Sequence, residues 1–338
     1  MRATDKLKKL SAVNGNPAGA VLTPCNSRNA VLLAAMANIT PSFIDSPLTL
    51  NSLLIASGIA LEEVLVLRHR PSEASLNRVF NWIAEERPDL FDCYQSTHGP
   101  RVEAALNRAK FVASFIRHEA GTALFVGLCR VAGTRTIGRD ECILRPAHIE
   151  LIQLGMSGVF ASSARKHVVE FDLAQTPWNE KWHGRLIIKW PGLERSWYRW
   201  ADRNVFPIQA IAQENLLRAP VPPWDRITLD WSELAVLPES WRAVLSQWRG
   251  IYLIIDRSDG RQYVGSAYGV ANILQRWLEY ARTGHGGNSQ LRQRAPANFS
   301  FSILQRVSPD LDAEKVIEIE GTWKRRLRSL SPSGLNDN

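Results

Sequence analysis

The sequence predicts an α+β protein built from more than one folded part. Short apolar runs, such as residues 111–116 and 123–131, predict β-strands, whereas other stretches have the apolar spacing of amphipathic helices. A proline-rich stretch, Ala219–Pro223, predicts a stiff boundary. The chain has 338 residues, which exceeds the usual size of about 100 to 150 residues for one domain. We therefore expect a larger mixed α+β domain over residues 48–224 and a second domain over residues 225–338.

Residues 1–47 come before the first periodic pattern. They combine a basic start with glycine, proline, asparagine and serine, which predicts a loosely ordered arm; an arm that touches DNA is the alternative. The most apolar run of this segment, residues 30–38, is too short to cross a bilayer and lies too far from the start for a typical signal peptide. We therefore expect a cytoplasmic protein.

The elements of the larger domain follow in order from Leu48. Helical segments are expected over residues 50–54 and at Ala60-Leu61, with a break at Gly58, and Val64–Leu67 has the composition of a buried strand. Residues 76–83 have helical spacing, with Ser72 or Ser75 as the N-cap. Further strands are expected at residues 111–116, 123–131, 168–173 and 185–190. Together these elements predict a substantial sheet, which could curl into a small barrel.

Two features of this domain suggest contact with nucleic acid. Arg68 and Arg70 follow the first predicted strand and could hold a phosphate, although a basic cluster at a strand end is often only solvated. Residues 94–98 are polar and lie between predicted elements, where a recognition loop would lie.

A tryptophan-rich stretch is a third candidate. Five of the chain's twelve tryptophans lie between residues 178 and 200, among lysines and arginines. Aromatic rings among cations suit stacking on an extruded base, and Trp182, Trp197 and Trp200 are the candidates for it. The alternative is a tryptophan-rich core, which the position of Trp190 at the end of an apolar strand favours.

The second domain is organised around two three-residue motifs. Apolar residues from Trp231 to Trp248 predict a helical lead-in, and Gly250-Ile251-Tyr252 follows it directly. After ten further residues comes Tyr263-Val264-Gly265. The intervening apolar run and Asp259-Gly260 predict a β-hairpin, because Asp-Gly tolerates the positive φ of tight turns. Such a hairpin would place the two tyrosines side by side.

A helix, a strand and a second helix are expected after the hairpin. Residues 272–282 predict a helix with Arg276 and Tyr280 four residues apart on one face. Residues 299–304 alternate as a strand, and a helix starting at residues 310–314 carries Glu320. His285 lies in the intervening glycine-rich loop, where it could approach DNA.

Tyrosines, an arginine and a carboxylate together suit the hydrolysis of a phosphodiester. Arginine neutralises a phosphate, a carboxylate holds a divalent cation, and a phenol can relay a proton from water. These residues resemble the GIY-YIG nuclease superfamily, through the two triplets, Arg276 with Tyr280, Glu320 with Trp323, and Gly334-Leu335-Asn336. The resemblance covers residues 248–338 and implies a small antiparallel sheet flanked by helices.

The resemblance also implies how the site would bind metal and phosphate. Glu320 would be the single ligand of Mg²⁺ or Mn²⁺, with Glu318 as the alternative. Arg276 would bind and polarise the scissile phosphate.

The remaining matched residues would act on water or complete the site. Tyr252 and Tyr263 would orient or deprotonate the attacking water, Tyr280 stands where relatives have tyrosine or histidine, and Asn336 would close the site. Some members of the superfamily carry lysine where this chain has Ser266. Which tyrosine is the general base therefore stays open.

Charge and cysteine spacing bear on the partners. The net charge of +8 favours a polyanionic partner such as DNA. The four cysteines show no Cys-x-x-Cys spacing, which predicts neither a zinc site nor a disulfide framework but reduced thiols.

The leading hypothesis is a metal-dependent DNA endonuclease whose first domain selects the target, as restriction or phage-defence enzymes do, with modified bases as one target. A structure-specific repair nuclease is an alternative, although helix-hairpin-helix and zinc modules are not visible. A non-catalytic DNA-binding protein is another, and the full set of candidate residues argues against it. A homing endonuclease is less favoured, because the companion module precedes the nuclease. A single metal site cuts one strand, so double-strand cleavage would require a homodimer or sequential nicking.

Overall fold

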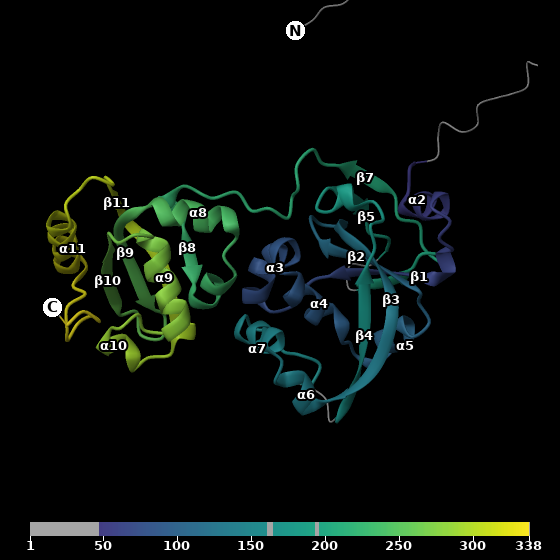
Figure 1. Ribbon diagram of the computed structural model, residues 1–338, viewed down its shortest axis with the longest axis horizontal. Coiled ribbons are helices and arrows are strands. Elements are labelled where there is room, and N and C mark those ends of the chain that lie inside the picture. Colours follow the sequence, from purple (N-terminus) through teal and green to yellow (C-terminus); the bar gives the residue numbers. More distant parts are fainter. Residues whose placement is uncertain (1–46, 161–164, 193–195, 338) are drawn as a thin grey trace, which may run out of the picture. The chain divides into compact units, whose positions relative to one another are not determined.

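The chain forms two β-sheets, one from strands before the proline-rich stretch in the sequence and one from strands after it (Figure 1). The structure is a computed structural model, and it describes residues 47–160, 165–192 and 196–337. The predicted α+β class is confirmed. The predicted N-terminal arm lies outside the described residues, apart from Pro47. No helix in the described part of the chain is both long and apolar enough to span a membrane.

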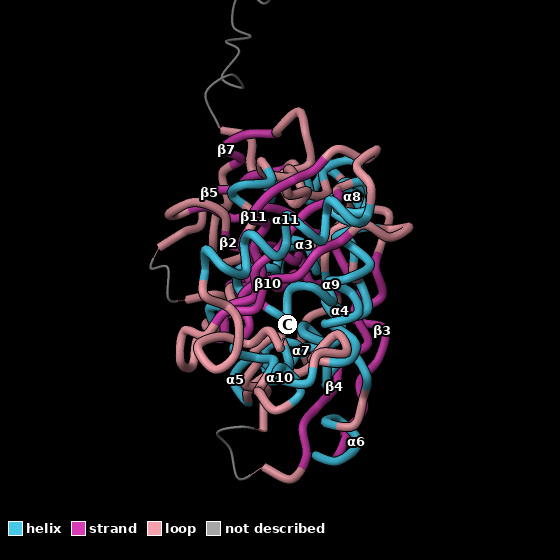
Figure 2. The backbone as a smooth tube through the Cα atoms, turned by 90° about the vertical axis from the view of Figure 1, so that its left-hand side faces the viewer, coloured by secondary structure: helices cyan, strands magenta, loops and turns pink. Residues whose placement is uncertain are grey.

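The first sheet has seven strands, and all the predicted strands of this region are confirmed. Its order is β6-β1-β2-β3-β5-β7, with β4 paired to β3. The strands are β1 (Val64–His69), β2 (Phe111–Arg117), β3 (Thr122–Gly138), β4 (His167–Gln175), β5 (Leu186–Lys189), β6 (Tyr198–Trp200) and β7 (Ile208–Ile211). β1 and β2 run parallel, whereas β3 and β4 lie side by side and antiparallel, and β3 ends at α6 (Arg139–Ile143) (Figures 1 and 2).

β1 is buried on both faces, as its unbroken apolar run predicts. Val64 and Val66 pack into one core and Leu65 and Leu67 into another, on the opposite face of the sheet. His69 continues the second set, because side chains alternate along a strand. This alternation places the His69 ring among the aromatic residues that the helices contribute.

Helices cover this sheet, and two predictions about them are wrong. The helices are α2 (Leu50–Ala56), α3 (Ala74–Glu86), α4 (Pro88–Ser96), α5 (Pro100–Leu106), α6 and α7 (Pro146–Gln153), with short 3-10 turns at Leu61–Glu63 and Glu180–Trp182. Neither Ser72 nor Ser75 caps α3; its N-cap is Glu73, and the Ser75 hydroxyl instead donates to the Leu154 carbonyl at 2.8 Å. Residues 94–96 are not a loop but the last turn of α4, which Pro88 starts because proline suits a first helical turn.

The second sheet has four antiparallel strands in the order β10-β9-β11-β8. The strands are β8 (Thr228–Asp230), β9 (Arg249–Asp256), β10 (Gln262–Ala267) and β11 (Phe299–Val307). The predicted hairpin is confirmed as β9 and β10, and Gly260 in its turn has a φ of 78°. The predicted helical lead-in from Trp231 to Trp248 forms the 3-10 turn Trp231–Val236 and α8 (Glu239–Gln247). β8, directly before it, was not predicted, and residues 228–230 pair with β11.

Two helices lie on opposite faces of this second sheet (Figure 1). α9 (Asn272–Thr283) packs through Trp277 on the face that carries Tyr252 and Ile254. α11 (Ala313–Leu327) packs through Val316 on the face that carries Ile251 and Leu253. The short helix α10 (Ser289–Arg292) and the 3-10 turn Pro296–Asn298 lead from α9 into β11. The helices predicted to carry Arg276 and Glu320 are thus confirmed.

Candidate active site

The glycine of each triplet lies where no side chain fits. Gly265 pairs with Tyr252 across the hairpin, and a Cβ on it would lie 2.4 Å from the Tyr252 hydroxyl. A Cβ on Gly250 would lie 2.1 Å from the Gln305 carbonyl oxygen, where β11 has an irregularity in its register. The two triplets therefore encode the close contact of β9 with its neighbours as well as the tyrosines.

Three tyrosines from three elements meet on the α9 face of the sheet. The ring centroids of Tyr252, Tyr263 and Tyr280 are 6.1 to 6.5 Å apart, and the hydroxyls of Tyr252 and Tyr280 are 3.1 Å apart. Tyr252 and Tyr280 are fully buried, whereas Tyr263 is half-buried. Gly286, in the loop after α9, adjoins Tyr280, since a Cβ there would lie 2.4 Å from its ring.

Arg276 lies beside this cluster, one helical turn before Tyr280. Its Nε donates to the Tyr252 hydroxyl at 3.4 Å, and its guanidinium carbon is 5.7 Å from the centroid of the Tyr280 ring. Burial raises the pKa of Tyr252 and of Tyr280, so both phenols are neutral at neutral pH. Tyr252 in turn raises the pKa of Arg276, although burial opposes that effect. No carboxylate in the described residues forms an ion pair with Arg276, so its charge faces neutral rings.

Glu320 belongs to a second group on the other face of the sheet. Its Oε2 accepts a hydrogen bond from the Ser266 hydroxyl, and its Oε1 lies 2.8 Å from the Lys324 ammonium. Side chains alternate along β10, so Ser266 faces α11 whereas Tyr263 faces α9. The structure therefore places the predicted residues in two groups, on the two faces of the edge strand β10.

Lys324 is a charged residue of the site that the sequence analysis missed. It lies one helical turn after Glu320 on α11, and both side chains are only 14% exposed. The signal available in the sequence was this spacing of four residues, which places a lysine beside a glutamate on one helix face. Trp323 is positioned differently, since its Nε1 donates to the Gln305 side chain at 2.9 Å.

The carboxylate of Glu320 is a suitable ligand for a hard cation, but its oxygens are bound by Ser266 and Lys324. Carboxylate oxygens are the ligands that Mg²⁺ prefers, usually with several waters. Within the described residues no three His, Cys, Asp or Glu side chains gather in a metal-binding group. For a metal to bind both oxygens of Glu320, Lys324 would have to release Oε1. The alternative ligand, Glu318, is exposed on the same helix.

Asn336 binds the backbone of β10. Its Oδ1 accepts from the Val264 N–H at 2.9 Å, and its Nδ2 donates to the Val264 carbonyl at 2.8 Å. The N–H of Leu335 donates to the Gln262 carbonyl at 2.8 Å. The C-terminal segment thus occupies the outer hydrogen-bonding edge of the strand that carries Tyr263 and Ser266.

The predicted nucleic-acid-binding residues are spread over the chain. Arg68 is 1% exposed and its guanidinium lies over Trp190, so it does not present its charge at the surface, whereas Arg70 is exposed. His285 is half-buried, and its ring accepts a hydrogen bond from the Gly287 N–H.

The tryptophans of the cluster differ in their surroundings. Trp190 is buried, as expected for a core residue. Trp182 and Trp200 pack against core clusters, and Lys181 and Arg108 respectively lie over their rings. Trp197 is half-buried beside two histidines.

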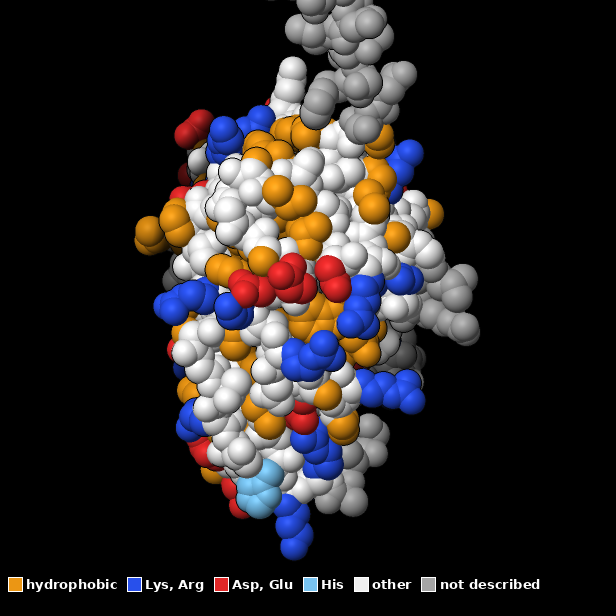
Figure 3. Space-filling view, turned by 90° about the vertical axis from the view of Figure 1, so that its right-hand side faces the viewer, with side chains coloured by type: hydrophobic (Ala, Val, Ile, Leu, Met, Phe, Trp, Pro, Cys, Tyr) orange, Lys and Arg blue, Asp and Glu red, His pale blue; other side chains and the backbone are white. Residues whose placement is uncertain are grey.

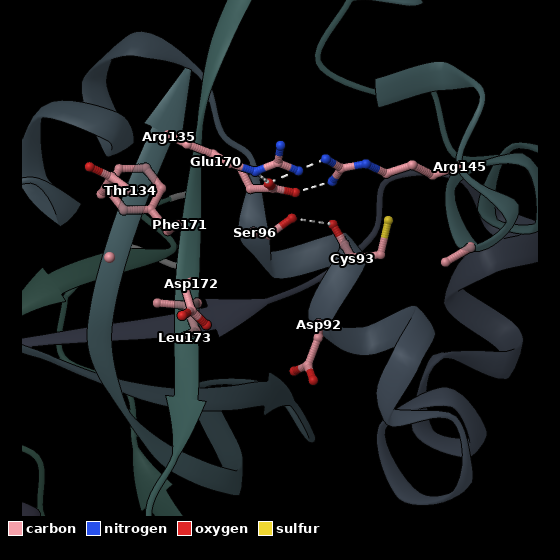
Figure 4. Close-up of a pocket in the computed structure, with 12 residues that line it drawn as sticks. Asp92, Cys93, Ser96, Thr134, Arg135, Arg145, Glu170, Phe171, Asp172 and Leu173 are labelled. Atoms are coloured by element: carbon pink, nitrogen blue, oxygen red, sulfur yellow. Dashed lines mark hydrogen bonds and ion pairs between the residues drawn. The ribbon is translucent and has the colours of Figure 1, made fainter. Parts of the chain in front are cut away.

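A cavity of about 610 Å³ lies between α4 and the β3–β4 pair (Figure 4). Glu170 lies between Arg135 and Arg145 in its wall, and both guanidiniums bind its carboxylate. Burial raises the pKa of the Cys93 thiol to about 11, so this cysteine is protonated at neutral pH. Arg135 and Arg145 are therefore both paired with Glu170, and Cys93 is not a thiolate nucleophile.

Comparison with known proteins gives one partial similarity. No protein-family model matches the chain, and no curated protein matches it. Two solved structures of the catalytic domain of the intron homing endonuclease I-TevI, one of them a mutant, are 24% and 26% identical over 27% of this chain. They are covered over 94% and 98% of their own length, with a TM-score of 0.23 in both cases. A similarity at this TM-score does not assign the chain to a family.

Proposed function

We propose that the chain is a divalent-metal-dependent DNA endonuclease of the GIY-YIG type. The observation that carries the proposal is the half-buried Arg276, which lies against neutral phenols and has no carboxylate partner among the described residues. A cation in a partly desolvated site attracts a phosphate more strongly than one in water does. Arg276 would bind the scissile phosphate and stabilise the charge that develops on it.

The burial of the tyrosines suggests different roles for them. Tyr252 and Tyr280 are fully buried and neutral, so they would hold Arg276 in place and donate hydrogen bonds. Tyr263 is half-buried and lies on the edge strand, so it is the phenol that water can reach. We assign to Tyr263 the orientation or deprotonation of the attacking water.

Glu320 would hold the metal ion at the same edge strand. When bound there, Mg²⁺ or Mn²⁺ would neutralise charge on the phosphate and on the leaving oxygen. Ser266 already holds one carboxylate oxygen of Glu320 in place, and Asn336 fixes the strand between Ser266 and Tyr263. A phosphate at this edge could therefore be approached from both faces of the sheet.

The region before the proline-rich stretch would select the DNA, in the manner of a restriction or phage-defence enzyme. Figure 3 shows one face of the molecule, on which lysine and arginine side chains are mixed with acidic and hydrophobic ones. The basic side chains of the described residues do not form one continuous patch on this face. We therefore propose that selection uses a local site, and that two copies of the chain, or two successive nicks, produce a double-strand break.

Plasmid cleavage tests the proposal. The full chain should cut plasmid or phage DNA with Mg²⁺ or Mn²⁺ present and stop when EDTA is added. Arg276→Ala and Glu320→Ala should each lower cleavage at least about a hundredfold, because each removes a charge that acts on the transition state. Arg282→Ala and Glu314→Ala are matched controls on the same two helices, at exposed positions, and should cut normally.

Two results would contradict the proposal. Metal-dependent cutting by Glu320→Ala with an unchanged melting temperature would remove Glu320 from the site. DNA binding without cutting, on plain, modified and branched substrates alike, would support the non-catalytic alternative. Cutting of branched DNA alone would indicate the repair nuclease.

A further inference from the structure

A second cavity, of about 770 Å³, lies at the carboxyl end of β1. Its wall comes from four segments: the end of β1 through the start of α3, the end of α4 and the residues after it, α7 and the loop after it, and the residue before β6. The lining residues include Arg70, Glu73, His69, Tyr94, His98 and Trp197. Its volume lies within the range of about 300 to 1,000 Å³ that small-molecule sites have.

The wall is largely aromatic. The His69 ring lies 5.7 Å from the Tyr94 ring and 6.3 Å from the Trp197 ring, and the His98 ring lies 5.5 Å from the Trp197 ring, measured between centroids. Tyr94 and Trp197 are half-buried, so part of each side chain remains exposed. Flat rings at such a cavity suit a flat aromatic ligand, because stacking tolerates any base.

The two histidines of the wall are neutral. Burial, followed by the effect of His98, lowers the pKa of His69 to about 3, and burial lowers the pKa of His98 to about 4. The Nε2 atoms of both rings are buried and have no hydrogen-bond partner in the described part of the chain. A buried polar atom without a partner is unfavourable by about 1 to 3 kcal/mol, so a polar ligand that reached these atoms would be favoured.

An exposed cation at this cavity could bind a phosphate at its mouth. Arg70 is exposed there, and the carboxylate of Glu73 is held by the hydroxyl of Ser157 at 2.6 Å. The cavity of Figure 4 differs, since its two arginines, Arg135 and Arg145, are both paired with Glu170. Of the two cavities, the one at β1 therefore combines aromatic walls, two neutral histidines and an exposed guanidinium.

We propose that the cavity at β1 binds a nucleobase extruded from DNA, with Trp197 stacked on the base and Arg70 on its 5′-phosphate. The proposal rests on the DNA endonuclease function and gives its first region a chemical task. Extrusion lets a protein examine the edge of one base, so the cavity would select a base by its size and its hydrogen-bonding groups. Trp182 and Trp200 take no part, since neither lines this cavity.

Deoxynucleoside 5′-monophosphates represent an extruded base with its phosphate, and they test the proposal without cleavage. Calorimetric titration of the full chain in EDTA would use dAMP, dCMP, 5-methyl-dCMP and base-free deoxyribose 5-phosphate. At least one nucleotide should bind about tenfold or more tightly than the base-free compound, because stacking adds to the phosphate contact. Equal binding of the base-free compound, or no binding of any nucleotide, would overturn the proposal.

Matched variants locate the binding. Trp197→Ala should weaken nucleotide binding about tenfold, whereas Trp200→Ala, in the adjoining strand, should not. Arg70→Ala should weaken it severalfold, whereas Arg130→Ala, at another exposed arginine, should not. If Trp197→Ala does not fold, the exposed Arg70 still decides the question, and an unchanged affinity of Arg70→Ala would refute the site.

The nuclease function fails separately. Arg276→Ala should bind nucleotides normally at the cavity while losing cleavage. Absence of cleavage in the wild type with intact nucleotide binding would refute the nuclease and leave the base site standing. Intact cleavage with no nucleotide binding would refute the base site and leave the nuclease function standing.

Discussion

Three glycines leave the space in which the tyrosines of the site and the strand β9 pack. Gly265 leaves room for the hydroxyl of Tyr252, and Gly286 leaves room for the ring of Tyr280. Gly250 lets β9 approach the backbone of β11. The hydroxyls of Tyr252 and Tyr280 lie 3.1 Å apart under these constraints, so small residues at a distance in sequence determine the geometry of Arg276.

Gly265→Ala tests this dependence on a single methyl group. The added Cβ would lie 2.4 Å from the Tyr252 hydroxyl, so the ring must shift. We expect a loss of about 1 to 3 kcal/mol in the free energy of unfolding, as overpacked cores show, and a larger relative loss of cleavage. Gly269→Ala is the control, since its nearest neighbour is a flexible glutamine side chain at 3.3 Å. Urea unfolding and plasmid cleavage measure both effects, and normal activity of Gly265→Ala would contradict the close contact.

The residues of the site could be predicted from spacing, but their surroundings could not. Arg276 and Tyr280 share a helix face because they are four residues apart, which is a local property. Arg68 is buried against Trp190, which is more than a hundred positions away in the sequence, so its burial could not be predicted from local spacing. The separation of Glu320 from the tyrosines by the sheet also required the three-dimensional structure.

At the scale of elements, long periodic segments were predictable and short ones were not. The hairpin, α9 and α11 carry their own signals in turn residues and apolar spacing. β8 has only three residues and exists through its pairing with β11, about seventy positions later in the sequence, so no strand was predicted there. The last turn of α4 is polar, so it was predicted as a loop.

α11 brings an ammonium to the carboxylate that would hold the metal, and Lys324→Met tests this pairing. Lys324 lies 2.8 Å from Glu320, so it competes with a cation for the same oxygen. We expect Lys324→Met to lower the Mg²⁺ concentration for half-maximal cleavage, and Lys315→Met, at an exposed position of the same helix, to leave it unchanged. A higher Mg²⁺ requirement, or loss of cleavage at saturating Mg²⁺, would instead show that Lys324 contributes directly to the reaction.

At the scale of the whole molecule, two buried histidines connect stability to pH. His69 and His98 have folded pKa values of about 3 and about 4, below the ordinary value of 6.5. The unfolded chain therefore takes up their protons first, and the stability present above pH 6.5 falls as the pH is lowered toward 4. Each histidine should contribute about 1 kcal/mol per pH unit in this window. Carboxylates with lowered pKa values, such as Glu170, act only at lower pH.

Urea unfolding at pH 7, 6 and 5 measures this slope. His98→Asn should reduce the slope by about 1 kcal/mol per pH unit, even though the variant is less stable at every pH. Besides burial, the Gln95 backbone and Glu103 act on the pKa of His98. His98 itself lowers the pKa of His69, so the variant also loses this smaller effect. His167→Asn, at an exposed histidine, should keep the wild-type slope. A slope unchanged by His98→Asn would show that this ring does not titrate as described.

The side-chain amide of Asn336 has a consequence for self-association. An open strand edge presents unpaired N–H and C=O groups that can template a strand from another molecule. In the second sheet, Leu335 and Asn336 cover one edge at Gln262 and Val264, and the other edge is the three-residue strand β8. Both edges are thus poor templates for amyloid-like strand addition. The residue expected to complete a nuclease site therefore also protects the folded chain against aggregation.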